Sequence, residues 1–151
     1  MISDHITFKE ATHSDTATRH GIENIPDDEQ IRNMKRWAAK VFEPLRLGLG
    51  EKPIHISSFF RCVPLNQKIG GSSTSQHCRG EAGDLDNDLS ESGPSNREIF
   101  DFIREHLMFD QLIWEFGTDD DPAWVHVSFT THCRGEVLQS YYSEGTKYRY
   151  I

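Results

Sequence analysis

The chain has 151 residues, of which 36% are hydrophobic and 26% charged, and its formal net charge is -8 at pH 7. This size and composition predict one soluble globular domain, residues 1–151, with a core of its own. The acidic balance argues against a nucleic-acid-binding face, which would need clustered lysine and arginine. No stretch approaches the ~20 consecutive apolar residues of a membrane-spanning helix.

The first twenty residues contain no apolar segment, so we expect no signal peptide and synthesis in the cytoplasm. The three cysteines, Cys62, Cys78 and Cys133, are odd in number and are not spaced as a zinc knuckle. This pattern favours free thiols in a reducing compartment. We also expect a monomer, with no nucleic-acid partner and no membrane span.

Capping residues predict the helices of the first fifty residues. Thr7 to Glu10 has the form of a capping box, and Ser14 can cap a second short helix that Gly21 ends. Asp27 caps a longer helix with acidic residues in its first turn. The apolar residues of that helix recur at helical spacing and predict a buried stripe: Ile31, Met34, Ala38, Val41 and Leu45. Pro44 should weaken or kink its end.

The middle of the chain alternates between strands and loops. Residues 53–61 alternate and are rich in β-branched side chains, which predicts a strand. Residues 62–80 show no clean period, so we expect a long loop, and long loops inside compact domains are usually functional. The remaining expected elements are a short strand at 81–86, a helix opened by a capping box at 95–98, antiparallel strands at 110–116 and 124–129 joined by an acidic loop, and a last strand within 141–151.

Three side chains form a candidate metal site. His77 ends the expected loop, Gly80 lets the chain turn, and Asp84 returns on the strand that follows. On the later strand His126 shares a face with Trp124 and Ser128, opposite an apolar face that should point to the core. Catalytic zinc generally has three such protein ligands and one open position. A structural histidine at a sheet edge is the alternative for any single one of the eight histidines.

A hydrolytic zinc site also needs a general base. Glu115 is the first candidate, because flanking aromatic residues should bury it partly and raise its pKa. The alternative for Glu115 is an ordinary strand carboxylate paired with a cation. Asp119 and Asp121 are the other candidates, and a solvated acidic loop is their simpler interpretation.

Arg61 closes the expected strand immediately before the long loop. A guanidinium in this place can hold a substrate carboxylate or a developing oxyanion. A surface salt bridge is an equally good interpretation from the sequence alone.

The five residues His77 to Glu81 recur as His132 to Glu136. The second copy has Gln139 where the first has Asp84, so it lacks the carboxylate of the candidate metal site. We interpret the second copy as a coincidence and expect His132 on the surface.

The spacing Ser75-x-His77-x-x-Gly80-x-Ala82-x-Asp84 resembles the S-x-H-x-x-G-x-A-x-D motif of the zinc D-Ala-D-Ala carboxypeptidases. These belong to the LAS group of metallopeptidases, which includes phage endolysins and the hedgehog-type fold. Trp124 to His126 is similar to the second W-x-H element of the group. Arg61 stands where the family has a strand-ending arginine before an N-x-x-x-G-G segment, here residues 66–71.

This resemblance implies a small α+β fold, with an antiparallel sheet, helices packed on one face and Zn²⁺ held on the open side. It implies hydrolysis of a peptide bond in peptidoglycan stem peptides, either D-Ala-D-Ala or, as in endolysins, L-Ala-D-Glu. It assigns His77, Asp84 and His126 as the metal ligands. Arg61 and Ser75 are then the expected substrate contacts.

The chain departs from the family pattern in two places, at Ala123 and at Phe59 with Phe60. Many relatives place the catalytic acid three residues before the last histidine, where this chain has Ala123. Either Glu115 takes that role from the neighbouring strand, or the protein is a non-catalytic zinc-containing module for wall binding or for a virion. Phe59 and Phe60 replace a smaller residue and a tyrosine and should narrow the substrate groove. Without a signal peptide, the expected routes to the cell wall are release as a phage or prophage lysin and carriage on a virion.

Overall fold

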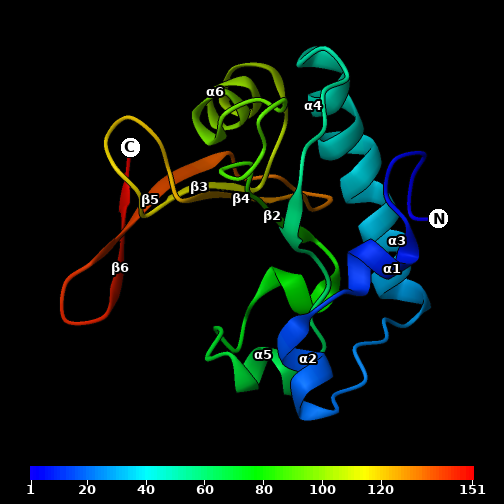
Figure 1. The fold of residues 1–151 in the computed structure, drawn as a ribbon. Coiled ribbons are helices and arrows are strands. Elements are labelled where there is room, and N and C mark those ends of the chain that lie inside the picture. The colour runs from blue at the N-terminus through cyan, green and yellow to red at the C-terminus, as the bar shows by residue number, and fades with distance from the viewer.

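The structure, a computed structural model, describes residues 1–151 and contains one six-stranded sheet (Figure 1). The strand order is β1-β2-β4-β3-β5-β6. The strands are β1 Ile56–Ser58, β2 Ala82–Leu85, β3 Gln111–Glu115, β4 Trp124–Ser128, β5 Glu136–Tyr142 and β6 Thr146–Tyr150. The α-helices are α1 Phe8–Thr12, α2 Asp15–His20, α3 Asp28–Trp37, α4 Glu43–Gly48, α5 Val63–Lys68 and α6 Asn96–His106. A π-helix, η1 Ala38–Phe42, and a 3-10 helix, η2 Gln76–Arg79, complete the elements.

The sheet is mixed, and the expectation of a purely antiparallel sheet is wrong at one pair of strands. β3 and β5 run parallel, with Gln111 opposite Glu136, whereas the other neighbouring strands are antiparallel. β4 ends beside the start of β3, and the connection 129–135 carries the chain past β3 at that same end. β5 therefore begins where β3 begins and must run in the same direction. The α+β class itself is confirmed.

The helices of the first fifty residues and the helix after Ser95 begin where the sequence predicts. The capping boxes at Thr7, Asp27 and Ser95 all form. The long helix expected after Asp27 is interrupted by the π-helix η1 immediately before Pro44. Proline has no N–H to donate and its ring collides with the carbonyl four residues earlier, so a widened turn relieves both problems. None of the helices combines the length and the apolar composition that crossing a membrane requires.

The hydrophobic core lies between the sheet and the helices α3, α4 and α6. Figure 1 shows α6 on one side of the sheet and α5 on the other. Trp37 of α3 is fully buried, and its indole N–H donates to the Val127 carbonyl over 3.0 Å. Its ring lies directly against Gly83, where an added Cβ would approach the ring to 2.5 Å. The glycine beside Asp84 thus lets α3 support the strand that carries the candidate ligand.

Two expected elements have different bounds in the structure. The strand predicted at 53–61 is limited to β1, because Phe59 and Phe60 turn into the core and the Phe60 N–H donates to the Ala11 carbonyl. The segment 62–80 is not a continuous loop, since it contains α5 and η2. Pro64 lies in the first turn of α5, where a proline favours a helix start. The expectation of a loop throughout 62–80 is therefore wrong where α5 and η2 lie.

The C-terminal tail forms two strands where the sequence predicts one. β5 and β6 make an antiparallel hairpin that extends the sheet beyond β3, at the far edge from β1 (Figure 1). Every residue of β6 is exposed to solvent. The hairpin therefore adds surface to the sheet and little to the core.

Candidate metal centre

His77, Asp84 and His126 come together from three elements: η2, β2 and β4. Gly80 ends η2 in the left-handed conformation, with φ 72°, so that the chain reverses into β2. A side chain there would also collide with the Gln30 carbonyl of α3, at 2.5 Å. Asp84 lies opposite His126 in the antiparallel register of β2 and β4. The expectation that these three residues lie together agrees with this arrangement.

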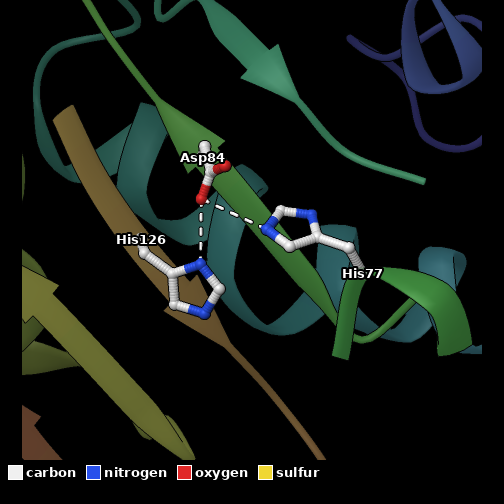
Figure 2. A group of neighbouring side chains, drawn as sticks. All are labelled: His77, Asp84 and His126. Atoms are coloured by element: carbon white, nitrogen blue, oxygen red, sulfur yellow. Dashed lines mark hydrogen bonds and ion pairs between the residues drawn. The ribbon is translucent and has the colours of Figure 1, made fainter. Parts of the chain in front are cut away.

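The donor atoms of the three side chains converge, as Figure 2 shows. The Asp84 Oδ1 atom lies 2.9 Å from His126 Nδ1 and 3.3 Å from His77 Nε2. One ligand atom from each residue lies within 4.8 Å of the other two. Two imidazole nitrogens and a carboxylate oxygen in one cluster form the kind of donor set that zinc takes in catalytic sites.

The protonation of His77 indicates that a cation belongs between these atoms. Its Nδ1 lies 2.6 Å from the Phe59 carbonyl, which can only accept a hydrogen bond, so the proton is on Nδ1. Nε2 then carries a lone pair, is buried, and has no hydrogen-bond partner. This lone pair faces a carboxylate oxygen, an arrangement that repels unless a positive charge lies between the two atoms. A carbonyl that orients a ligating histidine in this way is typical of metal sites.

Electrostatics keep the cluster in its metal-binding form. Burial lowers the pKa of His77, which favours the neutral imidazole. Burial alone would raise the pKa of Asp84, but protons on the two neighbouring histidines, whose place a metal cation would take, hold that pKa well below its usual range. Asp84 is therefore ionised and His77 neutral at ordinary pH. Both are the forms that bind a metal.

Arg61 supports the outer oxygen of Asp84. Its Nη2 atom lies 3.8 Å from Asp84 Oδ2, and its Nη1 donates to Asn66 Oδ1 over 3.4 Å. Asn66 in turn donates to the Ser72 carbonyl, and its side chain occupies the space that a Cβ on Gly71 would need. The N-x-x-x-G-G segment thus holds the loop around Arg61. Arg61 also lines the pocket, so orienting Asp84 is a role in addition to the predicted substrate contact.

A cavity of about 450 Å³ opens over the three donors. Glu115 and Ser75 both line it, and no hydrogen bond within the protein occupies the Ser75 hydroxyl. Asp119 and Asp121 do not line it, and the Asp121 carboxylate instead accepts the Arg97 N–H at the start of α6 over 2.6 Å. Glu115 is therefore the one carboxylate besides Asp84 in the wall of this cavity.

The environment of Glu115 suits a proton acceptor. Its side chain is buried, and burial raises its pKa, as the flanking aromatic residues predict. The Ser140 hydroxyl donates to Glu115 Oε2 and accepts the Phe116 N–H over 3.1 Å. Ser140 thus holds one oxygen of the carboxylate and leaves Oε1 available. Ser140 is a residue that sequence reasoning missed, since a single serine in a polar strand gives no signal.

Residues 4–128 match the model of the family described as peptidase M15. The chain belongs to the peptidase M15 family. The resemblance drawn from the Ser75 to Asp84 motif is confirmed at the level of the family.

A zinc D-Ala-D-Ala carboxypeptidase from Streptomyces albus G is a relative of this M15 peptidase. The two are 42% identical over 43 residues, which is 28% of this chain and 17% of the relative. The chain therefore matches less than a fifth of that relative's length. Both comparisons support a zinc-dependent peptidase, because the family is one of peptidases and the relative is named for its zinc.

A network that reaches beyond the matched range at Arg134 holds the turn that carries His77. Asp110 is buried and accepts hydrogen bonds from Arg134 Nε, at 2.9 Å, and from Arg134 Nη2, at 2.6 Å. The other donor is Gln76, the neighbour of His77, whose Nε2 lies 2.9 Å from Asp110 Oδ2. The second copy of the repeated five residues is thus structural at Arg134. His132 is exposed, as expected.

Replacing Arg134 with alanine is expected to lower the free energy of unfolding by about 1–3 kcal/mol at neutral pH, because a buried carboxylate loses a charged partner that is itself half exposed. Hydrogen bonds from Arg134 lower the pKa of Asp110 from 3.8 to about 2. Because the pKa of Asp110 is lower in the folded state, Asp110 stabilises the fold at pH values above the ordinary carboxyl pKa. This contribution disappears as the pH falls through about 2. Urea unfolding at several pH values measures the difference.

The matched control for Arg134 is Arg79, its counterpart in the first copy, which pairs with Glu81 at the surface over 2.8 Å. Arg79→Ala should change the free energy of unfolding by less than about 1 kcal/mol. Equal losses in the two variants, or a loss in Arg134→Ala that persists below pH ~2, would contradict the proposed role of Asp110.

Proposed function

We propose that this M15 peptidase hydrolyses a peptide bond in the stem peptides of peptidoglycan with the help of Zn²⁺. D-Ala-D-Ala and L-Ala-D-Glu are the two candidate bonds. The observation that carries the proposal is the unpartnered, buried His77 Nε2 facing Asp84 and His126 in a cavity that also contains Glu115. Peptidoglycan lies outside the cytoplasm, so we propose action at the wall, after release as a phage or prophage lysin or on a virion.

His77, Asp84 and His126 are the proposed zinc ligands. Two neutral imidazoles and one carboxylate leave the complex with a net positive charge. A zinc ion held by these residues would supply Lewis-acid chemistry: it would lower the pKa of a water molecule and polarise the carbonyl of the scissile bond. The Phe59 carbonyl and Arg61 fix the orientation of His77 and Asp84 respectively.

Glu115 is the proposed general base. Its raised pKa brings the carboxylate closer to the pH at which a base must both accept a proton and release it. The hydrogen bond from Ser140 fixes Oε2 and prevents free rotation of the carboxylate, so Oε1 keeps one orientation. A proton taken up on Glu115 can then pass to the leaving amine. This assignment explains how the site can function with Ala123 in the position of the usual acid.

Arg61 and Ser75 are the proposed substrate contacts. Burial lowers the pKa of Arg61, but the guanidinium remains a cation beside Asp84. Arg61 lines the cavity, and from there its positive charge can hold the carbonyl that is attacked or a carboxylate of the stem peptide. The free Ser75 hydroxyl on the same wall can bond to the peptide backbone.

The test uses the purified chain loaded with one equivalent of Zn²⁺, compared with the same preparation treated with a chelator. We expect the zinc form to release peptides from isolated sacculi or to shorten a soluble pentapeptide stem, and the chelated form to be inactive until zinc is restored. Mass spectrometry of the products identifies the bond. Stoichiometric zinc binding without any cleavage would support the non-catalytic module instead.

A further inference from the structure

The β5–β6 hairpin contributes to the candidate active site although it lies beyond the residues that match the M15 family. The match ends at residue 128, whereas Leu138, Thr146 and Tyr148 line the cavity above the three metal donors. Ser140 of the same hairpin bonds to Glu115. The hairpin is therefore a part of the pocket wall that belongs to this chain and not to the shared family segment.

Register places three tyrosines on the pocket side of the hairpin. Ser140 pairs with Tyr148, and it points to the pocket side because it reaches Glu115. Residues two positions away share that side, which gives Tyr142 on β5 and Tyr150 on β6. Tyr142, Tyr148 and Tyr150 are 77%, 54% and 74% exposed, so their rings are largely uncovered. We name these three residues the tyrosine platform.

The tyrosine platform carries no cation of its own. Lys147 and Arg149 alternate with the platform residues on β6 and so point to the opposite side. Arg149 lies there over the ring of Tyr141, 5.5 Å from its centroid, and bonds to Gln139 at 2.7 Å. Arg134, the cation beside Tyr150, is already paired with Asp110 and Glu136, so an anionic stretch of peptide would find no free cation there. An uncharged ligand whose rings have apolar faces and hydroxyl groups could stack on the aromatic rings and form hydrogen bonds with the phenol groups.

We propose that the tyrosine platform binds the N-acetylated sugars that carry the stem peptide. This inference rests on the proposed function, and it adds a glycan contact to the peptide site. The platform is continuous with the cavity through Tyr148, so a substrate that fills the cavity can extend onto it without leaving the sheet.

The spacing of the strands also relates the platform to the bond that is cleaved. β3 and β5 lie between β4 and β6, so three strand spacings, about 14 Å, separate His126 from the platform strand. An extended peptide covers about 3.5 Å per residue. Four intervening residues cover about 14 Å, whereas one residue covers only about 3.5 Å and leaves the sugar short of β6. The inference therefore favours cleavage at D-Ala-D-Ala.

The test compares one pentapeptide stem with and without its disaccharide, using zinc-loaded enzyme. We expect kcat/KM to be about tenfold higher for the glycosylated stem, and this preference to disappear in the double variant Tyr142→Ala/Tyr150→Ala. Tyr141→Ala is the matched control, because Tyr141 lies on the same strand and faces the other way. It should keep the full preference. A preference that survives the double variant, or that Tyr141→Ala abolishes equally, overturns the proposal.

Binding of the free disaccharide separates this inference from the proposed function. We expect the disaccharide to shift the NMR signals of the platform tyrosines in the unmodified protein, and we expect no binding by the double variant. If the enzyme cleaves neither stem but binds the sugar in this pattern, the proposed function fails and the platform stands. If both stems are cleaved and the disaccharide does not bind, the platform fails alone. Self-association that the double variant removes, without a sugar effect, would assign the surface to a second copy of the chain.

Discussion

Replacing His77 with alanine is expected to remove stoichiometric zinc binding and to abolish peptidase activity. The variant deletes the one donor whose lone pair is fixed toward Asp84 by the Phe59 carbonyl. Loss of an outer partner of a metal ligand alone typically costs 10- to 100-fold in metal affinity, so loss of a ligand should exceed about 100-fold. Metal analysis of the dialysed protein and a zinc titration monitored by calorimetry measure the effect.

His132 provides the matched control for His77. It occupies the same place in the second copy of the repeated five residues, but it is exposed and lies outside the cavity. His132→Ala should bind one zinc ion and retain activity. Zinc binding that is unchanged in His77→Ala, or reduced equally in both variants, would show that the metal site lies elsewhere.

Replacing Glu115 with glutamine is expected to lower kcat by about 10²- to 10⁴-fold while the bound zinc stays at one equivalent. The amide keeps the shape of the side chain but cannot accept the proton. Steady-state kinetics with metal analysis on the same samples separates the two effects. Asp119→Asn is the control, because this acidic residue lies in the exposed loop and does not line the cavity. If Asp119→Asn lowered kcat more than Glu115→Gln does, the general base would lie in the loop instead.

The same Glu115 variant should stabilise the metal-free fold. Burial raises the pKa of Glu115, so the folded state disfavours the carboxylate, and the penalty appears as the pH rises from the ordinary carboxyl pKa through the raised one. The glutamine variant has no charge to bury. After chelation at neutral pH its melting temperature should exceed that of the unmodified protein, and the difference should vanish at acidic pH. A lower melting temperature at every pH would show that Glu115 is stabilising in its buried position.

The placement of the candidate metal ligands was predictable from the sequence because each of these residues follows a local rule. Strand alternation places His126 away from the core, which Val125 and Val127 confirm by being fully buried. Gly80 reverses the chain between His77 and Asp84, as the left-handed conformation requires of a glycine. These rules act over a few residues, so no knowledge of distant contacts was needed.

The parts that sequence reasoning missed depend on pairings between distant segments. Ser140 reaches Glu115 only because β5 lies parallel to β3, and nothing in residues 136–142 indicates that neighbour. Arg134 carries a signal in the repeated five residues, but its partner Asp110 cannot be identified without the fold. The π-helix before Pro44 is a local effect. From the sequence, Pro44 predicts only a weakened or kinked end of the helix.

Zinc-edge anomalous scattering from a crystal of the zinc-loaded protein tests the central claim most directly. The account predicts one peak at about 2.0–2.2 Å from His77 Nε2, His126 Nδ1 and an Asp84 oxygen, with Glu115 facing its open position. A peak held by other residues, or a site between His77, Asp84 and His126 that stays without signal in a protein that binds zinc, would contradict it.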